Sequence, residues 1–210
     1  MQSSDKKLFV EGVNDREVVY RVENCYELRD ICEVKALGSK QGVRQALELH
    51  LNEMASKVKI IGVIIDADQD VSSSWASIKS VIDSTNNYVA PMDIPLGGLI
   101  LKPSVPDNPK VGVWIMPNNS NRGMLEDFMK EMIPQDDNLV GIVSNTLDDL
   151  ESKGLQRYKA VHRSKAWIHT YLAWQDEPGN TLATAVDQNV LNPRAAIVKS
   201  FADWMRLLFA

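Results

Sequence analysis

The fold is decided by one stretch of chain, Val58-Lys59-Ile60-Ile61-Gly62-Val63-Ile64-Ile65, which ends at Asp66. Its nearly continuous β-branched residues predict a strand of a parallel sheet that is buried on both faces. Amphipathic helices are predicted before it, at 43–54, and after it, at 72–84, because apolar residues recur there every three or four positions. The stretch is therefore predicted to lie in the middle of an α/β domain.

The same alternation of strand and helix continues on both sides of this stretch. Further strands are predicted at 7–10, 31–36 and 111–116, with a short one at 99–101 inside a Pro- and Gly-rich excursion. Asn14 is predicted to cap a helix that ends near Cys25, and another helix is predicted at 123–132. The pattern predicts an α/β fold of the Rossmann-like kind, with about four parallel strands flanked by helices.

The last third of the chain is predicted to be helical, at 139–153, 159–174 and 193–209. We therefore expect an α/β core at 1–138 and a helical C-terminal extension at 139–210. The extension is expected to pack on the core, so that the whole chain forms a single compact domain.

Composition and charge restrict the partners and the location. The 23 Lys and Arg residues against 28 Asp and Glu give a net charge of −5, so a nucleic acid would need local basic patches or a bound metal ion. No apolar run approaches the roughly 20 residues of a membrane span, and no apolar leader follows Met1. Cys25 and Cys32 lack the spacing of a zinc site. A cytoplasmic protein without a membrane partner is expected.

Acidic and amide side chains follow three of the predicted strands, at the point where each strand ends. They are Glu11 after the first strand, Asp66, Asp68 and Asp70 after 58–65, and Asn118, Asn119 and then Glu126 after 111–116. Parallel strands bring their carboxyl ends to one edge of a sheet, where ligands of open α/β folds bind. Clustered carboxylates need a positive charge between them, and oxygen ligands favour Mg²⁺ or Mn²⁺. The alternative is that each acid caps a helix or lies solvated in a loop.

A basic cluster is predicted on the helix at 159–174. His162, Lys165 and His169 are spaced i, i+3 and i+7, which places them on one helical face. A lysine there can neutralise charge that develops on a phosphate, so Lys165 is a catalytic candidate. His162, His169, Asn118 and Asn119 are candidates for substrate binding. The alternative is an ordinary solvated face.

Two motifs resemble the Toprim domain, which topoisomerases, primases and overcoming-lysogenization-defect (OLD) nucleases share. They are Phe9-Val10-Glu11-Gly12 with Asp15, and Ile64-Ile65-Asp66-Ala67-Asp68 at the end of a later strand. The resemblance covers residues 6–135. The whole chain, including the segments 123–127 and 162–167, is similar to a group of standalone Toprim-like proteins named DUF3226.

The resemblance implies roles for several acids. Glu11 would act in proton transfer or metal binding, and Asp66 and Asp68 would bind the first metal ion. The nuclease branch of the family implies Asp15 and Glu126 as ligands of a second ion, and Asp70 is added as a further candidate. The sequence shows no topoisomerase tyrosine domain, primase zinc module or ATPase domain, so those activities are not expected of it.

Three functions remain open from the sequence. The first is Mg²⁺- or Mn²⁺-dependent phosphodiester hydrolysis, as a nuclease that acts on nucleic acid, with Glu11 and Lys165 as catalytic residues. The second is an Asp-based small-molecule phosphatase of the haloacid-dehalogenase type, with Asp66 as nucleophile and Asp68 as acid. That family carries its Asp-x-Asp motif on the first strand, whereas here it ends the third. The third is a non-catalytic or partner-dependent module that works with a separate ATPase or another protein, and an oligomer is compatible with all three.

Overall fold

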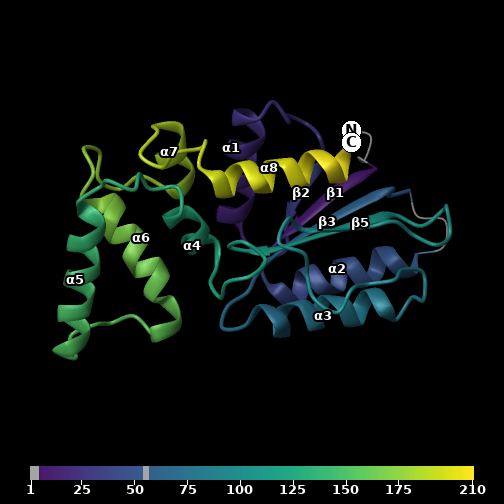
Figure 1. The fold of residues 1–210 in the computed structure, drawn as a ribbon, viewed down its shortest axis with the longest axis horizontal. Helices are drawn as coiled ribbons and strands as arrows, with labels where there is room; N and C mark the ends of the chain where they lie inside the picture. Colours follow the sequence, from purple (N-terminus) through teal and green to yellow (C-terminus); the bar gives the residue numbers. More distant parts are fainter. Residues whose placement is uncertain (1–4, 54–56) are drawn as a thin grey trace.

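A five-stranded sheet with helices on both faces forms the centre of the molecule (Figure 1). The computed structural model describes residues 5–53 and 57–210. The strand order is β2-β1-β3-β5-β4, and every neighbouring pair is parallel except β5 and β4. The strands are β1 (Lys6–Val10), β2 (Glu33–Ala36), β3 (Ile60–Asp66), β4 (Leu99–Leu101) and β5 (Lys110–Met116). The predicted α/β class is confirmed, and β4 adds a fifth, antiparallel strand at one edge.

Two helices cover each face of the sheet. Helices α2 (Lys40–Asn52) and α3 (Val71–Asp83) lie on one face, and α1 (Val13–Cys25) and α8 (Ala196–Phe209) lie on the other (Figure 1). Alternate residues of β3 enter two separate cores, with Ile61 on the α2 and α3 side and Ile64 on the opposite side. The strand is therefore buried on both faces, as its β-branched sequence predicts. Met54, the end of the predicted helix 43–54, lies outside the described residues.

The C-terminal helix α8 packs directly on the sheet because two glycines leave room for it. Gly62 of β3 and Gly112 of β5 are paired in register, and the side chain of Leu208 lies over both. A Cβ atom at Gly112 would overlap Leu208, which is fully buried. The indole N–H of Trp204 also donates to the carbonyl of Leu99 in β4 at 3.1 Å. The C-terminal helices thus share a core with the α/β part, while the expected boundary at 138/139 stays a prediction.

The remaining helical segments are α4 (Leu125–Lys130), α5 (Leu139–Ser152), the 3₁₀ turn η1 (Ala160–His162), α6 (Arg163–Ala173) and α7 (Leu182–Asp187). In the last third of the chain, the helices depart from the prediction in three places. The predicted helix 159–174 is divided, because the chain forms a 3₁₀ turn before α6 begins. Helix α7 was not predicted, since six residues are too few to show a helical period. The predicted helix 193–209 begins only at Ala196. None of the helices in the described part of the chain has the length and hydrophobicity of a transmembrane segment.

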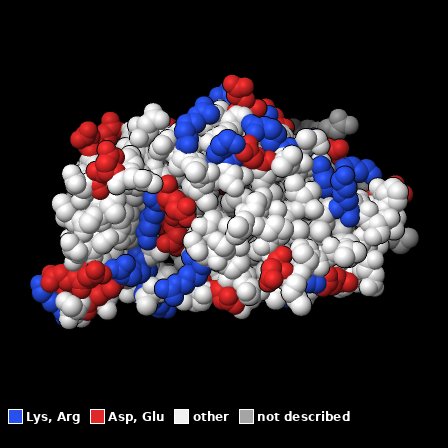
Figure 2. All heavy atoms as spheres, viewed as in Figure 1, with Lys and Arg blue, Asp and Glu red and all other residues white. Residues whose placement is uncertain are grey.

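Charged side chains of both signs are mixed on the surface, in keeping with the small net charge. On the face drawn in Figure 2, acidic and basic side chains lie side by side where the α5–α6 hairpin meets the α/β part of the molecule. No basic face large enough to attract a polyanion is visible in this view. On this face a nucleic acid would therefore have to be recognised by a few local cations.

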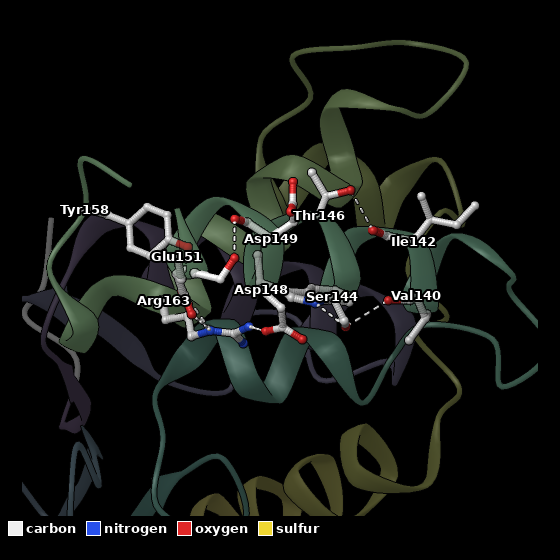
Figure 3. A network of polar contacts seen from close by, with 11 residues as sticks. Val140, Ile142, Ser144, Thr146, Asp148, Asp149, Glu151, Tyr158 and Arg163 are labelled. Carbon is white, nitrogen blue, oxygen red and sulfur yellow. Dashed lines mark hydrogen bonds and ion pairs between the residues drawn. The ribbon is translucent and has the colours of Figure 1, made fainter. Parts of the chain in front are cut away.

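An ionic network ties α5 to the start of α6 (Figure 3). The guanidinium of Arg163 donates to the Glu151 carboxylate at 3.0 Å and also pairs with Asp148. The hydroxyl of Tyr158 donates to the same Glu151 carboxylate at 2.6 Å. Because Arg163 is the first residue of α6, this network sets the position of the residues that follow it, among them Lys165.

Candidate acidic site at the carboxyl edge of the sheet

Hydrogen bonds join the ends of β1, β3 and the start of α4. The backbone N–H of Asp66, at the end of β3, donates to Glu11 Oε1 at 2.9 Å. Asp66 Oδ1 in turn accepts from the backbone N–H of Leu125 at 3.0 Å. Glu11 follows β1 directly, so both acids lie at the carboxyl edge, where the parallel topology predicts them.

The start of α1 places a third acid in the site. The helix begins at Val13 with Gly12 as its N-cap, and Asp15 Oδ2 accepts from the Gly12 N–H at 3.0 Å. The prediction that Asn14 caps this helix is wrong, because the carboxylate of Asp15 reaches back to the first free N–H group instead. Glu126, in the first turn of α4, is a fourth acid, and it is only 4% exposed.

These acids strongly perturb one another. Burial, together with the charges of Asp15, Glu11, Glu126 and Asp68, raises the pKa of Asp66 from 3.8 to about 8. Burial, with smaller contributions from the charges of Glu11 and Glu126, raises the pKa of Asp15 to about 6, although the hydrogen bond from the Gly12 N–H opposes this. The pKa of Glu11 is also raised by burial, although the Asp66 N–H and Lys40 oppose this. The site therefore carries more negative charge than its own cations neutralise.

This excess charge predicts how the stability of the metal-free protein depends on pH. Asp66 has a folded pKa of about 8, above its ordinary 3.8, so the folded state holds a proton that the unfolded state has lost between these values. Stability should therefore fall as pH rises from 6 to 8, by at most roughly 1.4 kcal/mol per pH unit for one group. Thermal unfolding in EDTA at pH 6 and pH 8 measures this.

Asp66→Asn should remove most of the fall in stability between pH 6 and pH 8. Part should remain, because burial also raises the pKa of Glu23, at the far end of α1, to about 7. Glu23→Gln should remove that part. A wild-type protein that is equally stable at both pH values would contradict the inferred burial of ionisable carboxyls.

Two lysines bring positive charge to the acids. Lys40, the first residue of α2, donates to Asp68 Oδ2 and to Ser74 Oγ. Lys165 Nζ lies 3.8 Å from Glu126 Oε1, and its side chain is 52% exposed. Lys40 was not predicted as a site residue. The sequence does contain a signal for Lys40. Because β2 is parallel to β1, the carboxyl end of β2 lies at the same edge of the sheet, and Lys40 begins the helix that follows β2.

The donor set fits a hard divalent cation, whereas the present side-chain arrangement does not form a finished site. All acids of the cluster offer oxygen ligands, and burial among like charges raises the pKa values of Glu11, Asp15 and Asp66, so a cation there would be favourable. Within residues 5–53 and 57–210, however, no three His, Cys, Asp or Glu side chains are arranged to hold a metal ion. One oxygen of each of Glu11, Asp15, Asp66 and Asp68 is engaged by a protein donor. Metal binding would therefore require side-chain rotations.

Three predicted site residues have structural contacts of their own. Asp70 is the N-cap of α3, where its carboxylate accepts from the Ser73 hydroxyl and from the N–H groups of Ser73 and Ser72, and these bonds lower its pKa. Asn119 is buried, accepts from the Ile115 N–H at 2.7 Å and donates to the Leu96 carbonyl. Asn118 accepts from the backbone N–H groups of Ser120 and Asn121. The structure thus gives these three side chains roles in a helix cap and in a loop.

The three residues of the predicted basic face, His162, Lys165 and His169, lie in different surroundings. His162 belongs to the η1 turn, so it does not share a regular helical face with the other two residues, contrary to prediction. His169 is exposed and lines a cleft of about 370 Å³ together with Asn14 and the loop before α7. Lys165 alone approaches the acids.

Asp127 is a neighbour of the site that the sequence did not indicate. Its carboxylate accepts from the Met124 N–H at 3.0 Å, from Ser164 Oγ at 2.6 Å and from Lys130 Nζ at 3.2 Å. It therefore ties the start of α4 to α6, and keeps Lys165 opposite Glu126.

The fold and the site define an α/β protein with a carboxylate cluster at the carboxyl edge of a mostly parallel sheet. Residues 5–210 match the family described as "Protein of unknown function (DUF3226)", and the chain belongs to this family, as predicted. No curated protein matches the chain. Among solved structures, the C-terminal region of the OLD protein of Xanthomonas campestris pv. campestris is similar to it. The TM-score is 0.48 at 13% identity, covering 100% of this chain and 97% of that one. At these values the likeness carries no argument about activity.

Proposed function

We propose that the protein hydrolyses phosphodiester bonds with the help of Mg²⁺ or Mn²⁺, as a Toprim-like nuclease. The observation that carries this proposal is the gathering of Glu11, Asp15, Asp66 and Glu126 at the ligand-binding edge of the sheet. Burial and neighbouring carboxylates raise the pKa values of Glu11, Asp15 and Asp66 there. Bringing like charges together is unfavourable, and a divalent cation is the simplest partner that compensates for it.

The acids have distinct parts in this proposal. Asp66 and Asp68 would hold the cation, and Asp15 and Glu126 would complete a second position. When bound, such an ion supplies positive charge to a phosphate and to the water that attacks it. Glu11 would accept the proton of that water, because its carboxylate is held at the edge by the Asp66 N–H.

Lys165 is the proposed catalytic cation. Its ammonium group lies 3.8 Å from Glu126, and about half of its side chain is exposed, so it can turn toward a bound phosphate. There it would stabilise the negative charge that increases as the phosphorus–oxygen bond breaks. The network that fixes Arg163 at the start of α6 keeps this lysine opposite the acids.

The proposal is tested by calorimetric titration of Mg²⁺ and Mn²⁺ into the wild type and into Asp66→Asn/Asp68→Asn. The same samples are then incubated with single-stranded and duplex nucleic acid. We expect the wild type to bind and cleave, and the double variant to do neither. Asp93→Asn/Asp107→Asn is the charge-matched control, because both acids are exposed and lie in the loops before β4 and β5. A wild type that binds neither ion would mean that the carboxylates are structural.

The same experiment separates the competing functions. Asp70→Ala should keep metal binding if Asp70 only caps α3, and should cost about 1 kcal/mol of stability because the cap is lost. A covalent aspartyl-phosphate trapped on Asp66 would favour a phosphatase. Metal binding without cleavage, together with co-purification of a separate ATPase, would favour a partner-dependent module.

A further inference from the structure

A cleft of about 390 Å³ lies beside the acids, between the loop after β3, the loop before α4 and the start of α6. The junction of the α5–α6 hairpin with the α/β part, where Figure 2 shows charges of both signs, contains these segments. Asp68 lines the cleft and also belongs to the acidic site. The cleft thus continues the acidic site toward α6. Its charged lining residues are Asp68, Arg122, Asp127 and Arg163.

Three of these four charged residues are compensated within the protein. Asp68 pairs with Lys40, and Asp127 pairs with Lys130. Arg163 pairs with Asp148 and Glu151, as Figure 3 shows. Arg122, by contrast, is exposed, and its guanidinium has no ion pair or hydrogen bond with any residue that the structure describes. The cleft therefore carries one free positive charge.

The backbone holds Arg122 close to the acids. Gly123, the next residue, forms two hydrogen bonds with Asp68, in which the Asp68 N–H donates at 2.8 Å and the Gly123 N–H donates at 2.9 Å. Asp68 has a φ of 55° and Gly123 a φ of 139°, so both loops adopt specific turns where they meet. Because the two loops are joined in this way, an anion bound by Arg122 would lie next to the acidic site.

We infer that Arg122 anchors a phosphate of a nucleic-acid substrate. This phosphate is the neighbour, along the same strand, of the phosphate whose bond is cleaved. The inference rests on the proposed function and specifies its substrate as a polymer. The guanidinium matches a phosphate by two parallel hydrogen bonds. A small ester with a single phosphate would occupy the acids and leave Arg122 without a partner. An oligonucleotide would use both positions.

The test compares Arg122→Ala with the wild type on two substrates, a single-stranded oligonucleotide and bis(p-nitrophenyl) phosphate. For the oligonucleotide, we expect KM to rise about tenfold with kcat nearly unchanged, because a charge-assisted contact made equally in ground and transition states is lost. For the small ester, kcat/KM should stay within about twofold, since it has no second phosphate. Arg122→Lys should recover part of the affinity.

Salt dependence supplies an independent readout. Oligonucleotide binding is followed by fluorescence anisotropy in Ca²⁺ at several salt concentrations. Arg122→Ala should reduce the slope of log K against log salt by about 0.7, the value for one phosphate contact to a single strand. Arg29→Ala is the matched control, because Arg29 is also exposed and lines a different cleft, together with Glu23 and Cys32.

The possible outcomes distinguish the inference from the function on which it rests. If the wild type cleaves the oligonucleotide but Arg122→Ala has the same KM and salt slope, the anchoring role is overturned while the nuclease function stands. If Arg122→Ala slows both substrates equally, Arg122 does not discriminate a polymer from a small ester, and the inference is also overturned. If the wild type cleaves neither substrate with Mg²⁺ or Mn²⁺, the proposed function itself fails.

Discussion

Replacing Asp66 with Asn is expected to abolish metal-dependent cleavage and, at the same time, to stabilise the metal-free protein. Cleavage should fall by at least about a hundredfold, since a central ligand is lost. Stability at pH 8 should rise by about 2 kcal/mol, because the amide removes a buried negative charge that four other carboxylates oppose. The Asn side chain retains an oxygen that can accept from the Leu125 N–H.

Two measurements check this pair of effects. Thermal unfolding at pH 8 in EDTA compares the stability of the wild type, Asp66→Asn and Asp107→Asn, and turnover is then measured with Mg²⁺. Glu11→Gln should also lose cleavage and keep the fold. An Asp66→Asn protein that is less stable than the wild type would show that the carboxylate stabilises the fold, which contradicts the charge excess inferred for the site. Unchanged cleavage would remove Asp66 from the proposed mechanism.

The second large effect is expected at Gly98, in the turn before β4. Its φ is +82°, a left-handed conformation that side chains other than glycine rarely adopt. A Cβ atom there would also overlap the indole ring of Trp204, which is 1% exposed and cannot move aside. Gly98→Ala should therefore cost about 3 kcal/mol, through backbone strain and overpacking together.

The neighbouring Gly97 is a matched control for this substitution. Its φ is not in the left-handed region, and no atom lies within 4 Å of a Cβ built on it, so Gly97→Ala should change stability little. Urea unfolding of both variants measures the difference. Since Trp204 belongs to α8, a large loss at Gly98 alone would show that the C-terminal helix and the sheet unfold together. Equal effects at both glycines would contradict this packing.

The sequence by itself determined the sheet and the edge at which the acids gather. The strand at 58–65 is recognisable because burial on both faces favours β-branched residues at nearly every position, and this preference is local. Once the strands are parallel, their carboxyl ends must share an edge, so Glu11 and Asp66 can be placed together from their positions alone. The four parallel strands were predictable for the same reason, whereas the family was predicted from the resemblance of the motifs at Glu11 and Asp66 and of the segments 123–127 and 162–167.

The tertiary structure alone decided which partner each polar side chain has. Lys40 meets Asp68 across 28 positions, and Ser164 meets Asp127 across 37. Such contacts depend on how whole helices pack against one another, and a local sequence pattern holds no information about that packing. Asp70 and Asp15 are both acids near a helix start, yet Asp70 is an exposed cap and Asp15 is buried among carboxylates. The sequence therefore determined where the acids gather, and packing decided which of them are buried and which are compensated. Packing also left Arg122, in the cleft beside them, without a partner among the residues that the structure describes.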